Sequence, residues 1–135
     1  MLSPELTSAL DRRINSVPIV ATLRMELVAL DEGYCETRTP HDRRYDGIFE
    51  SFHGGLLMTV ADTTACWAIL TRAGADARLT TTDMNIRFLA PCRSGVTAKA
   101  RLIKFGRTLC PVEVNLFDEA GAHVAVAQVT YILLK

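Results

Sequence analysis

One aspartate, Asp62, stands inside a long apolar stretch of this sequence, eight positions after the first glycine of a His53-Gly54-Gly55 run. Burying a carboxylate costs free energy unless the protein compensates for it, so Asp62 is the first candidate for a functional residue. An ionised carboxylate can act as a nucleophile or can activate a water molecule as a general base. Glycines at a helix start expose free N–H groups, which can stabilise negative charge on a carbonyl oxygen. These residue types therefore suit attack on a carbonyl compound.

Gly54 and Asp62 cannot easily serve one carbonyl group from a single chain. On one helix, their separation spans roughly 12 Å at about 1.5 Å per residue. Two antiparallel helices that meet across a dimer interface could bring Asp62 of one copy to Gly54 of the other. The spacing therefore favours a homo-oligomer with a shared site.

The segment that carries these residues, 53–73, is apolar on nearly all sides of a helical wheel. Such a helix belongs in the interior of a domain or in a membrane, and this one is too short and polar to span a bilayer comfortably. The sequence predicts a buried central helix with Gly74 as its C-cap. A second, amphipathic helix is expected within 1–18, where Ser3 and Pro4 are typical of a helix start and Pro18 ends the segment.

The remaining segments alternate apolar and polar residues, which predicts strands. In one of them Met84, Ile86 and Phe88 share a face, and Asp83, Asn85 and Arg87 share the opposite face. Pro111 argues for an edge or a bulge in its strand. A polar loop is expected over 40–52, and strands are expected over 20–29, 34–39, 79–89, 95–105, 109–117 and 124–134. The prediction is one α+β domain over 1–135, in which a curved antiparallel sheet of about six strands wraps around the central helix.

Composition excludes several classes of partner. Lys plus Arg and Asp plus Glu both number 15, and this zero net charge predicts no nucleic-acid or membrane partner. The four cysteines are widely spaced, so neither a metal site nor a disulfide framework is expected. Free thiols in a reducing cytosol and the lack of a signal-peptide pattern predict a cytoplasmic protein.

The predicted arrangement is the hotdog fold, and three motifs resemble a family within it. The run His53-Gly54-Gly55, six residues and Asp62 resembles the H-G-G-x6-D signature of acyl-CoA thioesterases of the phenylacetate-pathway (PaaI) type, in the 4-hydroxybenzoyl-CoA thioesterase superfamily. The segment 80–91 resembles the family strand that ends in F-L-x-P, and 104–108 resembles the family hairpin with Gly-Arg at its tip. The resemblance covers the chain from about Leu23 onward.

This resemblance implies an acyl-CoA thioesterase for a small, medium or aryl acyl group. Asp62 would be the nucleophile or the general base, and Gly54 and Gly55 would bind the oxyanion. His53 would either fix the loop and cap the helix or act as an acid–base group. Thr81 matches a Ser or Thr position near the family site. No cofactor is implied beyond coenzyme A, which is part of the substrate. Family sites are shared between subunits, which implies at least a dimer and allows a tetramer.

Three cations, Arg87, Lys104 and Arg107, could bind the phosphates of coenzyme A, although strand and turn cations are also usual on solvated surfaces. The sequence departs from the family at 45–51, where many relatives carry an Asn or Gln and this chain has no amide side chain. Asp46, Glu50 or Ser51 could substitute.

Two alternatives stay open. The first is a non-catalytic acyl- or CoA-binding protein, in which Asp62 has a structural role. The second is a hotdog hydratase or dehydratase, which is disfavoured because the D-x-N-P-x-H and H-F-P-G patterns of those branches do not occur.

Overall fold

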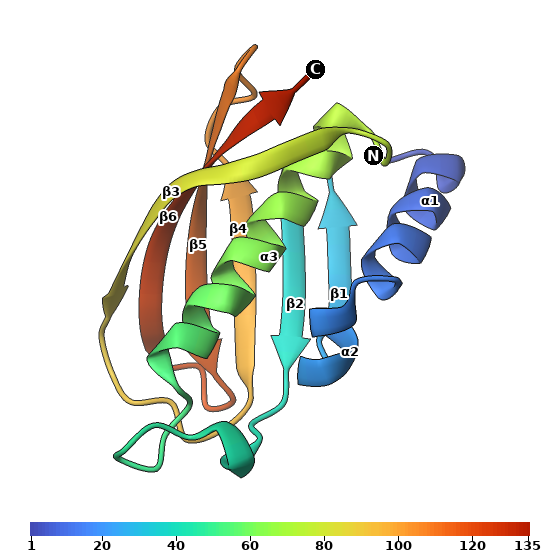
Figure 1. Ribbon diagram of the computed structural model, residues 1–135. Helices are drawn as coiled ribbons and strands as arrows, with labels where there is room; N and C mark the ends of the chain where they lie inside the picture. The colour runs from blue at the N-terminus through green and yellow to red at the C-terminus, as the bar shows by residue number, and fades with distance from the viewer.

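A computed structural model describes residues 1–135 and contains one antiparallel sheet with one long helix across it (Figure 1). The helical segments are α1 (Pro4–Asn15), α2 (Pro18–Leu23), the 3-10 helix η1 (Arg43–Tyr45) and α3 (Gly54–Ala73). The strands are β1 (Glu26–Asp31), β2 (Tyr34–Thr39), β3 (Arg78–Phe88), β4 (Val96–Leu102), β5 (Leu109–Asp118) and β6 (His123–Leu134). The predicted order of two strands, a long helix and four strands is therefore confirmed.

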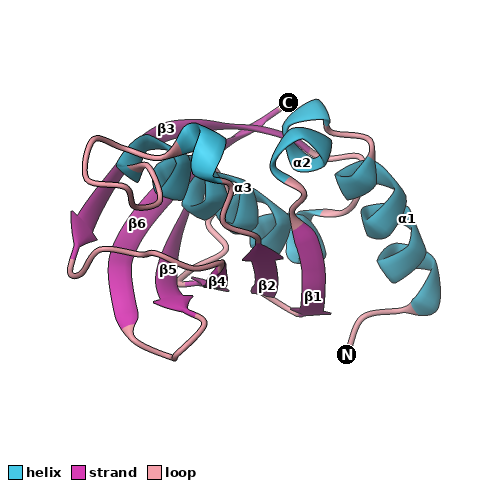
Figure 2. Cartoon of the chain, turned by 90° about the horizontal axis from the view of Figure 1, so that it is seen from below, coloured by secondary structure: helices cyan, strands magenta, loops and turns pink.

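The six strands are ordered β1-β2-β4-β5-β6-β3, so β1 and β3 form the two edges of the sheet. Figure 2 shows the sheet curving around α3, with α1 and α2 beside the β1 edge. Small alanines on the inner face of the sheet, such as Ala98, Ala100 and Ala127, let the helix approach closely. This wrapped arrangement confirms the expected hotdog fold.

By length and composition alone, the central helix α3 is apolar enough to cross a membrane. In the structure, however, it packs against strands β2, β4, β5 and β6 as the core helix of the domain. The helix itself supplies hydrogen-bond acceptors for its threonine hydroxyl groups. Thr59, Thr63 and Thr64 each donate to the carbonyl four residues earlier.

The amino-terminal region corrects one prediction, because residues 20–23 belong to the helix α2 rather than to the start of a strand. Pro18 occupies the first turn of α2, where a missing N–H costs nothing. Arg24 then ends the helix with a left-handed backbone, φ 58°, and β1 begins only at Glu26. Leu23 and Met25 are buried, so the apolar residues of this segment do face the core. They belong, however, to the end of α2 and to the short connection between α2 and β1.

Pro111 also differs from its prediction, because β5 is an interior strand and Pro111 pairs with Thr130 without a bulge. The pairing of β4 with β5 ends at the pair Leu102–Val112, next to the proline. On this side the Pro111 carbonyl still accepts from the Ile103 N–H at 2.8 Å. The missing N–H therefore lies beyond the end of the β4 ladder, where the sheet does not need it.

The edge strand β3 contains a bulge that matters for the site. Thr81 pairs with Tyr131 and Met84 pairs with Val129, yet Asp83 is the partner of the single residue Thr130 between them. One extra residue on β3 is thus accommodated. As a result, Thr81 faces the inside of the sheet together with Met84 and Ile86.

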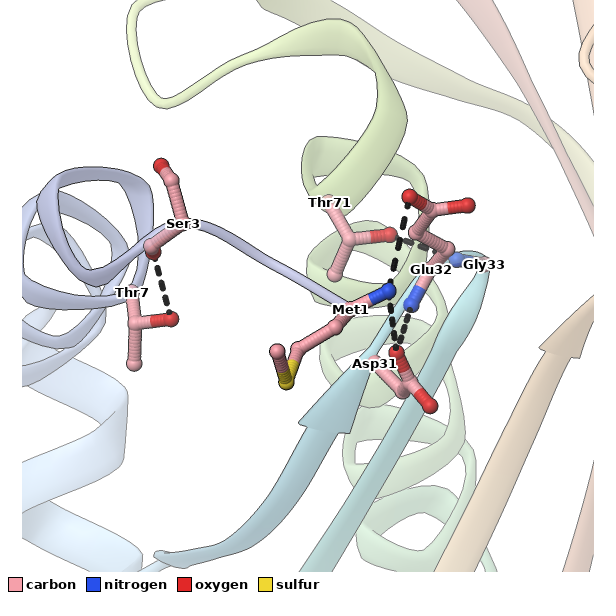
Figure 3. A network of polar contacts seen from close by, with 7 residues as sticks. All are labelled: Met1, Ser3, Thr7, Asp31, Glu32, Gly33 and Thr71. Atoms are coloured by element: carbon pink, nitrogen blue, oxygen red, sulfur yellow. Dashed lines mark hydrogen bonds and ion pairs between the residues drawn. The ribbon is translucent and has the colours of Figure 1, made fainter.

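The carboxyl-terminal end of α3 is tied to the turn between β1 and β2 (Figure 3). The Thr71 hydroxyl accepts a hydrogen bond of 2.7 Å from the Gly33 N–H. The amino group of Met1 lies 3.8 Å from an oxygen of Asp31 and 3.7 Å from an oxygen of Glu32. The helix that carries Asp62 is therefore anchored at the end opposite to Gly54.

Candidate active site

The Asp62 carboxylate lies in the middle of α3 and is held by two hydroxyl groups from the sheet. Thr81 on β3 donates to Asp62 Oδ1 at 2.7 Å, and Tyr131 on β6 donates to the same oxygen at 2.8 Å. The second oxygen, Oδ2, accepts no hydrogen bond from the chain, and Asp62 as a whole is half-buried. The arrangement fixes one oxygen and leaves the other free to meet a reactant.

The titratable groups beside the carboxylate are neutral at neutral pH. Burial raises the pKa of the Tyr131 phenol, so it stays a hydrogen-bond donor. Burial also raises the pKa of the Cys66 thiol, one helical turn after Asp62, to about 11. A thiol with so high a pKa is a poor nucleophile at neutral pH, which leaves Asp62 as the reactive candidate on this face of the helix.

The amino-terminal end of α3 offers one free amide rather than two. The His53 side chain caps the helix, because its Nδ1 accepts a hydrogen bond of 2.9 Å from the Gly55 N–H. The Gly54 N–H donates to no acceptor in the chain. Of the two glycines expected to bind an oxyanion, the structure therefore leaves Gly54 with an available donor, at the positive end of the helix dipole.

A hollow of about 400 Å³ adjoins Gly54, and its wall contains no charged side chain. Phe52, Leu57, Phe88 and Leu89 supply apolar surface, and Ser51 supplies a hydroxyl group. The Phe88 ring lies so close to Gly54 that a Cβ added there would be 3.2 Å from it. A side chain at this position would therefore be tightly packed, and the Phe88 ring would have to shift by a few tenths of an ångström to make room for it.

The loop 40–52 contains the three residues that could replace the family amide, and their surroundings differ. Asp46 is engaged by His41, whose Nε2 lies 2.6 Å from Asp46 Oδ1. Glu50 is exposed and has a left-handed backbone, φ 57°. Ser51 alone lines the hollow beside Gly54. Of the three candidates, Ser51 is the one positioned next to the free amide.

The three cations considered for phosphate binding do not meet within one chain. Lys104 and Arg107 lie in the turn between β4 and β5, near the carboxyl-terminal end of α3 (Figure 1). Arg72 in the last turn of α3 stacks on Phe105 of this turn, with its guanidinium carbon 5.1 Å from the ring centroid. Arg87 lies near the other end of β3, next to Phe88. Any common phosphate site for all three would need more than one copy of the chain.

One residue of the carboxylate site, Tyr131, escaped the sequence analysis. It lies in a run of apolar residues at the end of the chain, 69 positions from Asp62, and no local motif marks it. The only available signal was that a buried tyrosine hydroxyl usually finds a partner. The pairing of Thr81 with Tyr131 across the β3–β6 ladder, which depends on the bulge, was not predictable from alternation either.

The fold and this geometry define a hotdog protein whose central helix carries a hydrogen-bonded carboxylate and begins with a free backbone amide. A family model described as the thioesterase superfamily matches residues 49–125, which is more than half of the chain. The protein therefore belongs to the thioesterase superfamily. The matched region contains the glycine pair, Asp62 and Thr81.

Solved structures of several other proteins resemble the chain along most of its length. A thioesterase family protein from Silicibacter pomeroyi is 23% identical, with a TM-score of 0.89 over 96% of this chain and 98% of that one. A thioesterase from Haemophilus influenzae is 27% identical, with a TM-score of 0.83 over 91% of this chain and 87% of that one. The PaaI protein from the phenylacetic acid degradation operon of E. coli is 18% identical, with a TM-score of 0.85 over 96% of both chains.

Proposed function

We propose that this protein hydrolyses acyl-CoA thioesters that carry a small, medium-chain or aryl acyl group, releasing the free acid and coenzyme A. The observation that carries the proposal is the state of Asp62: Oδ1 is held by two hydroxyl groups, and Oδ2 is free. The uncharged hollow beside the Gly54 amide supports an apolar acyl group rather than one with a second carboxylate.

The chemistry can follow either of two routes that use the same residues. Asp62 Oδ2 can attack the thioester carbonyl carbon, which gives a mixed anhydride that water then hydrolyses. Alternatively, Oδ2 can take a proton from a water molecule that attacks the same carbon. In both routes the carbon–sulfur bond breaks, coenzyme A leaves as a thiolate that takes up a proton, and the Gly54 N–H stabilises the oxyanion.

A complete site requires a second copy of the chain. Gly54 and Asp62 lie on one helix, separated by roughly 12 Å along its axis, so one copy does not bring both to one carbonyl group. The free edge of β3 offers unpaired backbone groups for a partner strand. Exposed apolar residues near its end, Phe88 at 51% and Leu89 at 53% exposure, favour burial in an interface. We infer at least a dimer, with a tetramer as a further possible assembly.

The cysteines support a reducing, cytoplasmic location for this reaction. All four are free, and Cys35, Cys92 and Cys110 are buried. Unpaired thiols are typical of proteins that work in a reducing compartment.

A second candidate, an acyl-binding protein without activity, is favoured by one observation. No amide side chain lies in the 45–51 loop, and Asp46 is already engaged by His41. Such a protein would bind acyl-CoA through the same hollow without breaking the thioester bond.

A hydrolysis screen tests the proposal and separates the two candidates. Purified protein is incubated with a panel of acyl-CoA esters, and released coenzyme A is measured with a thiol reagent against a substrate-free blank. Asp62→Asn should lower turnover by about two orders of magnitude or more. Asp83→Asn, which changes an exposed carboxylate on β3, serves as the matched control and should leave turnover unchanged. Binding of acyl-CoA without hydrolysis would favour the second candidate, and a folded, active Asp62→Asn would make Asp62 structural.

A further inference from the structure

We propose that Tyr131 is a positioning residue that determines which oxygen of Asp62 reacts. The inference rests on the proposed hydrolase function. The Tyr131 hydroxyl contacts Oδ1 and the backbone carbonyl oxygen of Asp62. These contacts leave Oδ2 as the single reactive oxygen of the carboxylate.

The contacts of the Tyr131 hydroxyl are what set it apart from an ordinary buried tyrosine. The hydroxyl lies 2.8 Å from Asp62 Oδ1 and 2.9 Å from the backbone carbonyl oxygen of Asp62. The hydroxyl has a single proton, which these two acceptors share, so one group contacts both the side chain and the backbone of the same residue. Rotation of the carboxylate would break the contact to Oδ1, so the side-chain torsion of Asp62 is held along with its position.

Thr81 reinforces this effect from the neighbouring strand. Thr81 and Tyr131 are cross-strand partners in the β3–β6 ladder, and both donate to Oδ1. Two donors fixed by one ladder define the plane of the carboxylate better than either donor alone. Tyr131 is 6% exposed, so water does not readily replace its hydroxyl.

The surroundings contain few groups that could confuse a titration. Burial, with a smaller contribution from the charge of Asp62, raises the pKa of both the Cys66 thiol on α3 and the Tyr131 phenol on β6, and the Arg13 charge on α1 also acts on Cys66. From β3 the contact is Thr81, which does not ionise. Burial keeps both of these titratable neighbours protonated at neutral and acidic pH. A change in the acidic limb of the pH–rate profile therefore reports on the Asp62 carboxylate itself.

The test compares Tyr131→Phe with a matched control, Tyr34→Phe. Tyr34 also donates its hydroxyl to a carboxylate, Glu36 Oε1 at 2.9 Å, but on β2 and away from Asp62. Tyr131→Phe should lower kcat about tenfold with little change in KM, because the anion loses a hydrogen-bond donor. The acidic limb of the pH–rate profile should move to higher pH, because proton binding to the carboxylate becomes easier. Tyr34→Phe should change neither quantity.

An activity-independent measurement separates failure of the inference from failure of the proposed function. The ¹³Cγ signal of Asp62, assigned with Asp62→Asn, is titrated in the wild type and in Tyr131→Phe. A midpoint that moves upward in the variant supports the positioning role even if no acyl-CoA ester is hydrolysed, in which case the hydrolase proposal alone fails. An unchanged midpoint in a folded Tyr131→Phe overturns the inference. So does a Tyr131→Phe variant whose kcat and pH profile match those of an active wild type.

Discussion

The His53 Nδ1 atom accepts a hydrogen bond of 2.9 Å from the Gly55 N–H, so the histidine next to the candidate site caps its own helix. A neutral imidazole in this arrangement carries its proton on Nε2. The contact consumes the amide of the second glycine and leaves that of Gly54 free. It gives His53 a structural role that accounts for its position without any proton transfer to substrate.

Replacing His53 distinguishes capping from catalysis. His53→Ala should lower the free energy of unfolding by about 1 kcal/mol, as expected for the loss of an N-cap. His53→Asn should recover most of that loss, because its amide oxygen can accept from the Gly55 N–H. Urea unfolding and hydrolysis assays check both variants. A folded His53→Asn that loses about two orders of magnitude in turnover would instead indicate a direct acid–base role.

Mixing two inactive variants tests the shared site. Asp62→Asn removes the carboxylate, and Gly54→Pro removes the free N–H at the first position of α3, where proline suits the backbone. Each mixed dimer would retain one intact combination of Asp62 and Gly54. If the two chains pair at random, an equal mixture should recover about a quarter of wild-type activity.

Differently tagged chains show whether mixed dimers have formed. No recovery in confirmed mixed dimers of folded chains would mean that each chain builds its own site. An active monomeric wild type would exclude sharing altogether.

The turn between β4 and β5 should contribute to nucleotide binding. Lys104→Ala and Arg107→Ala should each raise KM for acyl-CoA by about two- to fivefold, the effect of losing one exposed charge contact. Thioesters of a short pantetheine fragment that lack the nucleotide should be affected less. Arg38→Ala, an exposed cation on β2, is the control. Equal losses with both kinds of substrate would argue against phosphate binding by this turn.

Alkaline pH should destabilise the protein through a half-buried thiol, Cys66, and a half-buried phenol, Tyr34. Burial raises the pKa of Cys66 from 9.0 to about 11 and the pKa of Tyr34 from 10.0 to about 12. The unfolded chain therefore loses these protons first, so their contribution is complete below about pH 9 and declines as pH rises toward 11 and 12. Urea unfolding between these values should give a shallower decline for Cys66→Ala than for the wild type. Parallel curves would show that the thiol does not contribute.

The fold was predictable because its strongest signals are local. The apolar segment that begins at Gly54 has too few polar positions to lie on a surface, and alternation along residues such as Met84, Ile86 and Phe88 reports a half-buried strand. Residues 20–23 were assigned wrongly because a short helix and a strand cannot be separated over so few apolar positions. The prediction for Pro111 was wrong because its tolerance depends on where the neighbouring strand β4 ends. That position is a property of the whole sheet, not of the residues near Pro111.

The candidate site was predictable only in part, for a similar reason. Asp62 and the glycine pair form a motif within one helix, so their spacing is visible in the sequence. The partners that define their chemistry come from elsewhere: Tyr131 reaches Asp62 from the last strand, and the capping contact of His53 depends on a side-chain rotamer. Such contacts between distant segments leave no periodic trace in the chain.

The bulge in β3 determines which residues of that strand face the site. Inward-facing positions are odd up to Thr81 and even from Met84 onward, so strict alternation would have turned Thr81 outward with Asp83 and Asn85. Losing one residue between these positions would preserve nearly every amino acid and yet reverse the face of one half of the strand. Related sequences should therefore tolerate substitutions within 78–88 far better than single-residue insertions or deletions, and the length of this strand should be inherited more faithfully than its composition.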